Sequence, residues 1–263
     1  MRSLLSRIDR ALAPAPDPAR VGWLKEWTYA HRGRHGADGA DGAVENAPAA
    51  FRAAIDARLG IECDIQRSAD GWPMIYHDWD FTRLHGRDQA GADLVREEWR
   101  ELRYSGGDES PFALQDLLTL VAGQVPLLIE IKSRRGYDVV PSCRAVVDAL
   151  AGYRGHHAVM SFDPRVSRWL ARHAPQTVRG LVMRQDAHPD ARSGFARHVA
   201  LWIARPHFVA FDVRALPDRF AANLRARGVP LLTWTVKTQA LLAVARRYAD
   251  APIAEGAGLP WPN

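Results

Sequence analysis

Two short runs of the sequence place charged side chains at alternate positions between apolar ones. Glu62 and Asp64 alternate with isoleucine and cysteine, and Glu130 and Lys132 alternate with isoleucine. Because successive side chains of a strand point to opposite faces, each pair shares one face, with its members roughly 6.6 Å apart along the strand. The two runs therefore predict strands that bring three carboxylates and a lysine to one site.

A cation is the natural partner for these carboxylates. Charged residues on one face of a single strand are often merely solvated, but the inner face of a parallel barrel is enclosed. Carboxylates there lose hydration and repel one another unless positive charge lies among them. Three oxygen ligands without a histidine or cysteine cluster favour one hard divalent cation, Mg²⁺ or Ca²⁺. With Arg32 and Lys132 added, a slight positive charge remains, which favours a phosphate ester as the ligand.

Two histidines stand at the ends of predicted strands. His31 ends the run 27–31, and His77 ends the run 73–77. Histidine exchanges protons near neutral pH, and barrels place catalysis at the carboxyl ends of their strands. A single histidine is usually structural, but this pair predicts a base and an acid on opposite sides of a scissile P–O bond.

The elements that must hold these residues alternate regularly along the chain. Strand-like runs separated by helical patterns predict an α/β fold, a TIM (β/α)8 barrel. These runs lie at about 27–31, 60–66, 126–132, 157–162, 178–183, 207–212, 230–236 and 251–254. The turn signal Asp70-Gly71 predicts a hairpin after the second strand, and the segment from about 78 to 112 then forms an excursion over the barrel mouth.

Composition and the N-terminal segment indicate the domain organisation and the location of the protein. The 263 residues, 47% hydrophobic and 25% charged, predict one globular barrel domain at 21–263, after a helix and proline-rich lead-in at 1–20. The lead-in helix packs on the domain or, alternatively, touches a membrane surface. Cys63 and Cys143 are expected to be core thiols in a reducing compartment. No signal-peptide core, membrane span or nucleic-acid motif is recognisable, so we expect a cytoplasmic protein with no nucleic-acid partner and no stable membrane insertion.

A series of short motifs runs along residues 27–256 in a specific order. The motifs are His31-Arg32-Gly33, Glu45-Asn46, Glu62-x-Asp64 before an Asp-Gly turn, His77-Asp78, Glu130-x-Lys132, Ser161-Phe162 and Trp234-Thr235-Val236. In this order they resemble the glycerophosphodiester phosphodiesterase family. The resemblance implies a TIM barrel with a hairpin excursion, and metal-dependent hydrolysis of a small glycerophosphodiester to sn-glycerol 3-phosphate and an alcohol.

The resemblance also implies roles for individual residues. It makes His31 and His77 the acid/base pair, one activating the glycerol 2-hydroxyl for attack on phosphorus and the other protonating the leaving alkoxide, before water opens the cyclic phosphate. The implied metal ligands are Glu62, Asp64 and Glu130, and the implied substrate contacts are Arg32, Lys132, Glu45 and Trp234. Trp234 is equally well read as an ordinary barrel-core residue.

Several departures from the family pattern bear on the substrate. The Arg34–Val44 connection is long, Ala47 replaces a threonine, Lys237 replaces an asparagine, and the last strand ends in Ala254-Glu255 instead of Thr-Asp. None of these is a proposed ligand or histidine, so we expect them to alter substrate preference. Two alternatives stay open, a related barrel phospholipase of the phospholipase D type and a non-catalytic phosphate-binding module. The sequence carries no signal for an oligomeric state.

Overall fold

The computed structural model describes residues 4–36, 42–104, 108–184 and 194–259, and it has the α/β fold of a TIM (β/α)8 barrel. Its parallel strands occupy the predicted runs to within about three residues. They are β1 (Tyr29–His31), β2 (Gly60–Arg67), β6 (Leu127–Ile131), β7 (His157–Ser161), β8 (Val178–Met183), β9 (Phe208–Asp212), β10 (Leu231–Val236) and β11 (Ala251–Ala254). The strands are almost wholly buried, as expected for a parallel sheet covered on both faces.

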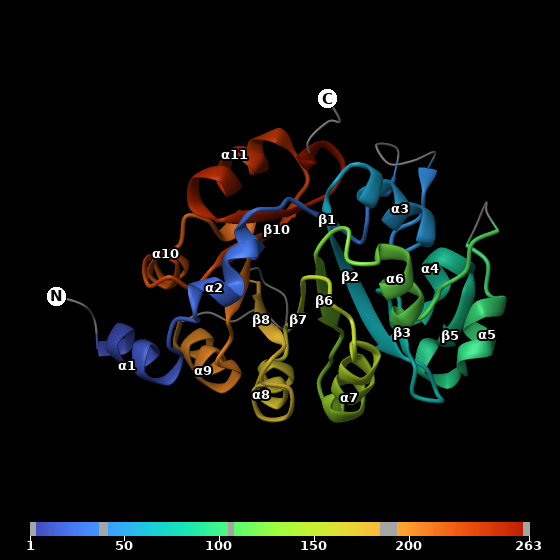
Figure 1. Ribbon diagram of the computed structural model, residues 1–263, viewed down its shortest axis with the longest axis horizontal. Helices are drawn as coiled ribbons and strands as arrows, with labels where there is room; N and C mark the ends of the chain where they lie inside the picture. The colour runs from blue at the N-terminus through green and yellow to red at the C-terminus, as the bar shows by residue number, and fades with distance from the viewer. Residues whose placement is uncertain (1–3, 37–41, 105–107, 185–193, 260–263) are drawn as a thin grey trace. The chain divides into compact units, whose positions relative to one another are not determined.

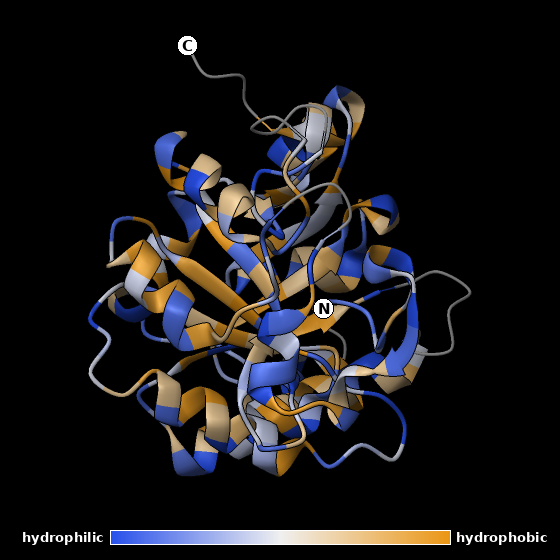
Figure 2. Ribbon diagram, turned by 90° about the vertical axis from the view of Figure 1, so that its right-hand side faces the viewer, coloured by the Kyte–Doolittle hydropathy of each residue, from blue (hydrophilic) through white to orange (hydrophobic). Residues whose placement is uncertain are grey.

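Helices follow the strands in alternation. They are α3 (Pro48–Asp56), α6 (Leu114–Val121), α7 (Val139–Ala149), α8 (Pro164–His173), α9 (Gly194–Ala204), α10 (Arg219–Ala226) and α11 (Gln239–Tyr248). Several begin where a side chain accepts a backbone N–H of the first turn, as Asp138, Asp163 and Asp218 do. Figure 2 shows hydrophobic and hydrophilic residues alternating along these helices, which is the pattern of helices with one buried face.

The chain divides into two compact units, which we describe separately. The terminal unit comprises residues 4–29 and 158–259, and its strands lie in the order β7-β8-β9-β10-β11, each parallel to the next. The middle unit comprises residues 30–157. Within it, β2 pairs in parallel with β6, and the short strand β3 (Pro73–Ile75) pairs antiparallel with β2. This pairing confirms the hairpin predicted after the second strand.

The segment after the hairpin is more ordered than the sequence indicates. It forms β4 (Asp80–Phe81), α4 (Thr82–His85), β5 (Arg87–Ala90) and α5 (Arg96–Glu101). Figure 1 shows α4, β5 and α5 near β3. These short elements surround an aromatic core in which Phe81 and Trp99 meet edge to face at 4.7 Å and Tyr76 joins them. Aromatic packing, which has no fixed sequence period, stabilises them, so periodicity alone could not find them.

The lead-in is built into the terminal unit. Its first helix, α1 (Leu4–Leu12), lies beside α9, and α2 (Pro18–Val21) follows it (Figure 1). Asp9 of α1 is buried, and its carboxylate accepts hydrogen bonds from His198 Nδ1 at 2.9 Å and Trp202 Nε1 at 2.8 Å. The helix therefore packs on the domain, as one of the two sequence-based interpretations predicts.

Replacing Asp9 by alanine tests this packing. We expect the Asp9→Ala variant to lose about 1–3 kcal/mol of unfolding free energy, because the indole N–H of Trp202 and the imidazole of His198 lose their acceptor. Urea unfolding of Asp9→Ala should be compared with that of Asp88→Ala, which changes an exposed aspartate. Equal midpoints for the two variants would show that the contacts of Asp9 with His198 and Trp202 contribute nothing measurable to stability.

Within the described residues, no helix combines the length and the apolar character that crossing a membrane requires.

Candidate functional site

The three carboxylates named from the sequence come together in the middle unit. Asp64 of β2 lies opposite Glu130 of β6 in the parallel register, and Glu62 lies two residues earlier on β2. Oxygen atoms of the three carboxylates all lie within 4.8 Å of one another. Glu62 and Asp64 are each 2% exposed and Glu130 is 7% exposed, so water cannot screen their mutual repulsion.

Two cations balance one of these carboxylates. Lys132 Nζ lies 3.3 Å from Asp64 Oδ1 and 3.1 Å from Glu130 Oε1, and Arg32 Nε lies 3.2 Å from Asp64 Oδ2. Burial alone would raise the pKa of Asp64, but Lys132 and Arg32 hold that pKa below its ordinary value. Asp64 is therefore ionised and paired on both oxygens.

Glu62 and Glu130 are less well compensated. Burial raises the pKa of the Glu62 carboxyl well above its ordinary value, and the charges on Asp64 and Glu130 raise it further. Burial also raises the pKa of Glu130, although Lys132 opposes this. The cluster thus carries more negative charge than its own cations neutralise. An all-oxygen donor set of this kind fits a hard divalent cation and does not fit a soft one.

A left-handed turn after β1 carries the first motif to the carboxylates. Arg32 and Gly33 both have positive φ, 58° and 80°. A Cβ at Gly33 would lie 2.9 Å from the backbone of Ala50, so this position needs glycine. The turn aims the backbone N–H of Arg32 at Glu62 Oε2, 3.1 Å away, and His31 Nε2 lies 4.0 Å from the same oxygen.

Asn46 belongs to this cluster, although the sequence singled out only its neighbour Glu45 as a candidate. The Asn46 side chain donates to Asp64 Oδ2 at 3.0 Å and accepts from the backbone N–H of Asp64 at 3.3 Å. Glu45 accepts from Arg32 Nη1 at 2.8 Å. The Glu45-Asn46 pair in the motif series was the available signal, since an amide can hold a carboxylate oxygen and its backbone N–H together.

His77 lies at the end of the hairpin, with its imidazole beside the next residue. His77 Nδ1 is 2.6 Å from Asp78 Oδ1, and Gln66 Nε2 donates to the backbone carbonyls of both residues. The backbone N–H of the preceding residue, Tyr76, donates to the carbonyl of Asp64 at 3.0 Å, which places His77 beside the carboxylate strand β2. The middle unit therefore brings His77 as well as His31 to the carboxylates.

Comparison with known proteins identifies the family. The sequence matches the model of the glycerophosphoryl diester phosphodiesterase family over residues 31–254. The chain belongs to this family. It is therefore a phosphoric diester hydrolase, which confirms the family predicted from the motif series.

Relatives of this phosphodiesterase carry the same name. The glycerophosphodiester phosphodiesterase of Caldanaerobacter subterraneus subsp. tengcongensis is 25% identical over 224 residues, covering 81% of this chain and 86% of the relative. Glycerophosphodiester phosphodiesterase 1 of Bos taurus is 23% identical over 243 residues, covering 80% and 71%. A phosphodiesterase from Oleispira antarctica, solved in complex with the product sn-glycerol-3-phosphate, superposes with a TM-score of 0.73 at 19% identity and covers 87% of this chain and 92% of its own. It shares the barrel fold.

The predicted substrate contact Trp234 and two departures from the family pattern lie in the terminal unit. Trp234 of β10 donates its indole N–H to the carbonyl of Ala210 at 3.1 Å and meets Phe162 edge to face at 5.2 Å. These contacts fix the ring, and its place beside a substrate stays a prediction. Lys237 Nζ lies 2.6 Å from Glu255 Oε1. The charge of Lys237, which replaces the asparagine of the family pattern, is thus paired with Glu255. Residues 37–41 of the long Arg34–Val44 connection lie outside the described residues.

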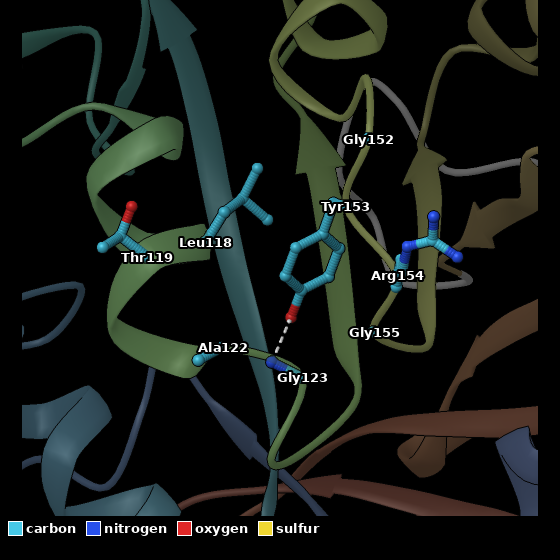
Figure 3. Close-up of a pocket in the computed structure, with 8 residues that line it drawn as sticks. All are labelled: Leu118, Thr119, Ala122, Gly123, Gly152, Tyr153, Arg154 and Gly155. Atoms are coloured by element: carbon cyan, nitrogen blue, oxygen red, sulfur yellow. Dashed lines mark hydrogen bonds between the residues drawn. The ribbon is translucent and has the colours of Figure 1, made fainter.

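A shallow pocket elsewhere in the middle unit of this phosphodiesterase does not coincide with the candidate site. Its volume is about 370 Å³, and Figure 3 shows its lining at the end of α6 and in the loop before β7, where Gly123 donates its backbone N–H to the hydroxyl of Tyr153 at 3.2 Å. Arg154 is the only charged residue in the lining. The pocket also precedes its strand, whereas barrels carry out chemistry at the opposite end.

Proposed function

We propose that this phosphodiesterase hydrolyses small glycerophosphodiesters to sn-glycerol 3-phosphate and an alcohol, using one divalent cation, Mg²⁺ or Ca²⁺. The observation that carries the proposal is the cluster of three buried carboxylates with oxygens within 4.8 Å of one another, in a chain of this family. The product complex of the Oleispira antarctica phosphodiesterase supports the same product class here. Such a product enters glycerol and lipid metabolism.

The charge balance supports a set of ligands for the cation. Glu62, Asp64 and Glu130 hold the cation, because Glu62 and Glu130 lack sufficient positive partners of their own. When bound, the cation supplies Lewis-acid stabilisation of negative charge on the phosphoryl group. Lys132 and Arg32 bind the phosphoryl oxygens from the adjacent positions. Burial alone would lower the pKa of Lys132, but Glu130 and Asp64 raise it, so the ammonium stays charged throughout turnover.

The two histidines move the protons. One takes the proton of the glycerol 2-hydroxyl as that oxygen attacks phosphorus, and the other gives a proton to the alcohol oxygen as its P–O bond breaks. Water then opens the cyclic phosphate, with the two proton transfers reversed, and both histidines return to their starting states. Glu45 orients Arg32, and Trp234 packs against the glycerol. Arg32 and Lys132 keep the phosphoryl group between the two imidazoles while this occurs.

We place the enzyme in the cytoplasm, because the buried thiols Cys63 and Cys143 suit a reducing compartment. A small glycerophosphodiester is its partner, and no nucleic acid is involved.

Removing the cation is the test of this function. Purified protein should release glycerol 3-phosphate from glycerophosphocholine, and EDTA should lower the rate by at least about 100-fold, because several kcal/mol of charge stabilisation are lost. Mg²⁺ or Ca²⁺ added in excess should restore the rate, and the better ion identifies the natural one. Product is measured by an assay specific for glycerol 3-phosphate.

The Glu62→Gln variant is the matched control, since it keeps the shape of one ligand and removes its charge. It should stay slow whatever ion is added. If no glycerophosphodiester gives metal-dependent product, the proposal is wrong. Release of choline from intact phosphatidylcholine would instead favour a phospholipase, and tight binding of glycerophosphocholine without turnover would favour a binding module.

A further inference from the structure

Arg83, a residue of the excursion, connects the two halves of the candidate site. Its Nε donates to Asp78 Oδ2 at 2.6 Å, while its Nη2 and Nη1 donate to the two oxygens of Glu45 at 2.5 and 3.2 Å. Asp78 contacts His77, and Glu45 contacts Arg32. A continuous series of charged contacts therefore runs from the imidazole of His77 to the guanidinium beside Asp64.

The excursion is built so that Arg83 faces this series. Phe81 is fully buried in the aromatic core, Leu84 packs against that core, and the ring of His85 lies 4.9 Å from that of Tyr104. Over one helical turn, positions 81, 84 and 85 share a face. Arg83 falls on the opposite face. Three side chains thus fix the core side of α4. The guanidinium of Arg83 points away from the core and donates to Asp78 and Glu45.

We propose that Arg83 is a positioning residue, which acts on catalysis by holding the Asp78 carboxylate against Nδ1 of His77. The inference rests on the proposed function, in which His77 transfers a proton. It goes beyond that function because it gives the excursion a task at the reacting centre.

The two oxygens of Asp78 explain why both partners are needed. Oδ1 faces His77 and Oδ2 faces Arg83, so the carboxylate is held from both sides. Burial alone would raise the pKa of Asp78, but the hydrogen bonds from His77 and Arg83 hold it well below its ordinary value. An ionised carboxylate can only accept, so Nδ1 carries the proton and Nε2 is left to exchange a proton with the substrate.

Removal of the guanidinium should therefore disturb His77 and leave the phosphate contacts in place. Without Arg83, Asp78 loses its second anchor and the imidazole loses its fixed orientation. Glu45 loses its contacts with Arg83 but keeps Arg32 as a partner, and Arg32 also contacts Asp64 directly, so we expect a smaller effect on phosphate binding. We expect kcat to fall by roughly 10- to 100-fold, the range seen when a hydrogen-bond partner that orients a metal-binding side chain is removed, with KM changed by less than about threefold.

The experiment compares Arg83→Ala, Arg83→Lys and Arg87→Ala on glycerophosphocholine in saturating cation. Arg87 is an exposed arginine of the same excursion, so its variant controls for loss of charge. Arg83→Lys should be intermediate, because an ammonium replaces the fork of donors by one point charge. Guanidinium ion in the millimolar range should restore part of the activity of Arg83→Ala and have no such effect on Arg87→Ala. A structural defect would show no such rescue.

A second readout does not depend on turnover. The imidazole nitrogen signals of His77 in the NMR spectrum should show a proton on Nδ1 in the wild type and a mixture of tautomers in Arg83→Ala. Unchanged kcat together with an unchanged tautomer would overturn the inference while leaving the proposed function standing. If the wild type hydrolyses no glycerophosphodiester, the proposed function fails, and the tautomer shift alone then decides whether Arg83 orients His77.

Discussion

Asp64→Ala is expected to abolish turnover and to lower the free energy of unfolding by about 1–3 kcal/mol. Asp64 is 2% exposed, and its two oxygens face Lys132 on one side and Arg32 and Asn46 on the other. The substitution removes the acceptor shared by Lys132, Arg32 and Asn46, a loss that is partly offset because the repulsion of Glu62 by Asp64 also disappears. It also removes a proposed ligand of the divalent cation. Activity is measured as glycerol 3-phosphate release, and stability by urea unfolding in EDTA, so that metal binding does not contribute.

Asp9→Ala is the matched control for this prediction, because Asp9 is also buried, at 4% exposure, but holds α1 on α9 in the terminal unit. It should lose stability and keep its activity once folded. Comparison of the two variants separates the loss of stability that follows removal of any buried aspartate from the loss of activity that is specific to the site. An Asp64→Ala protein that folds and retains more than about a tenth of the wild-type rate would remove Asp64 from the proposed ligand set.

The site strands could be predicted because their constraint is local. In β2 the charged positions 62 and 64 alternate with apolar positions 61, 63 and 65, and the two-residue period of a strand assigns them to opposite faces. The same holds for Glu130 on β6. The parallel register then aligns Asp64 with Glu130. Both steps depend on backbone geometry that the residue pattern already encodes.

The site residues outside the strands cannot be predicted in this way, because no regular period governs the direction of their side chains. Asn46 reaches Asp64 from a backbone with φ of 59°, and Arg83 reaches Asp78 and Glu45 from a helix of one turn. Their positions are determined by packing of the excursion and by contacts far apart in the sequence. A charged residue in an aperiodic segment is indistinguishable from a solvated surface residue until its partners are known, so the sequence does not identify Arg83.

The connection between two departures from the family pattern is also visible only in the structure. Lys237 and the Ala254-Glu255 ending of β11 stand as separate oddities in the sequence. Parallel pairing of β10 with β11 brings Val236 opposite Ala254, so the next residues on each strand, Lys237 and Glu255, can form the ion pair observed. The two charges of this ion pair neutralise each other.

His31→Ala is expected to lower kcat by about 10²- to 10⁴-fold, the range that proton transfer by a positioned side chain contributes. His31 ends β1, its side chain is only 14% exposed, and Nε2 lies 4.0 Å from Glu62 Oε2. The imidazole therefore stands at the edge of the carboxylate cluster, where a phosphoryl group held by Arg32 and Lys132 would meet it. Steady-state kinetics on glycerophosphocholine measure the effect.

The loss must be shown to be chemical and not structural. The variant should unfold at a urea concentration close to that of the wild type and should bind Mn²⁺, followed by its paramagnetic resonance signal, with an affinity within about threefold, because His31 is not among the three proposed ligands. His173→Ala, which removes an exposed histidine whose ring packs at a tilt against Trp169, should keep full activity. If His31→Ala turns over at the wild-type rate, the proton is carried by another group, and His77 with its Asp78 partner becomes the sole candidate of the pair.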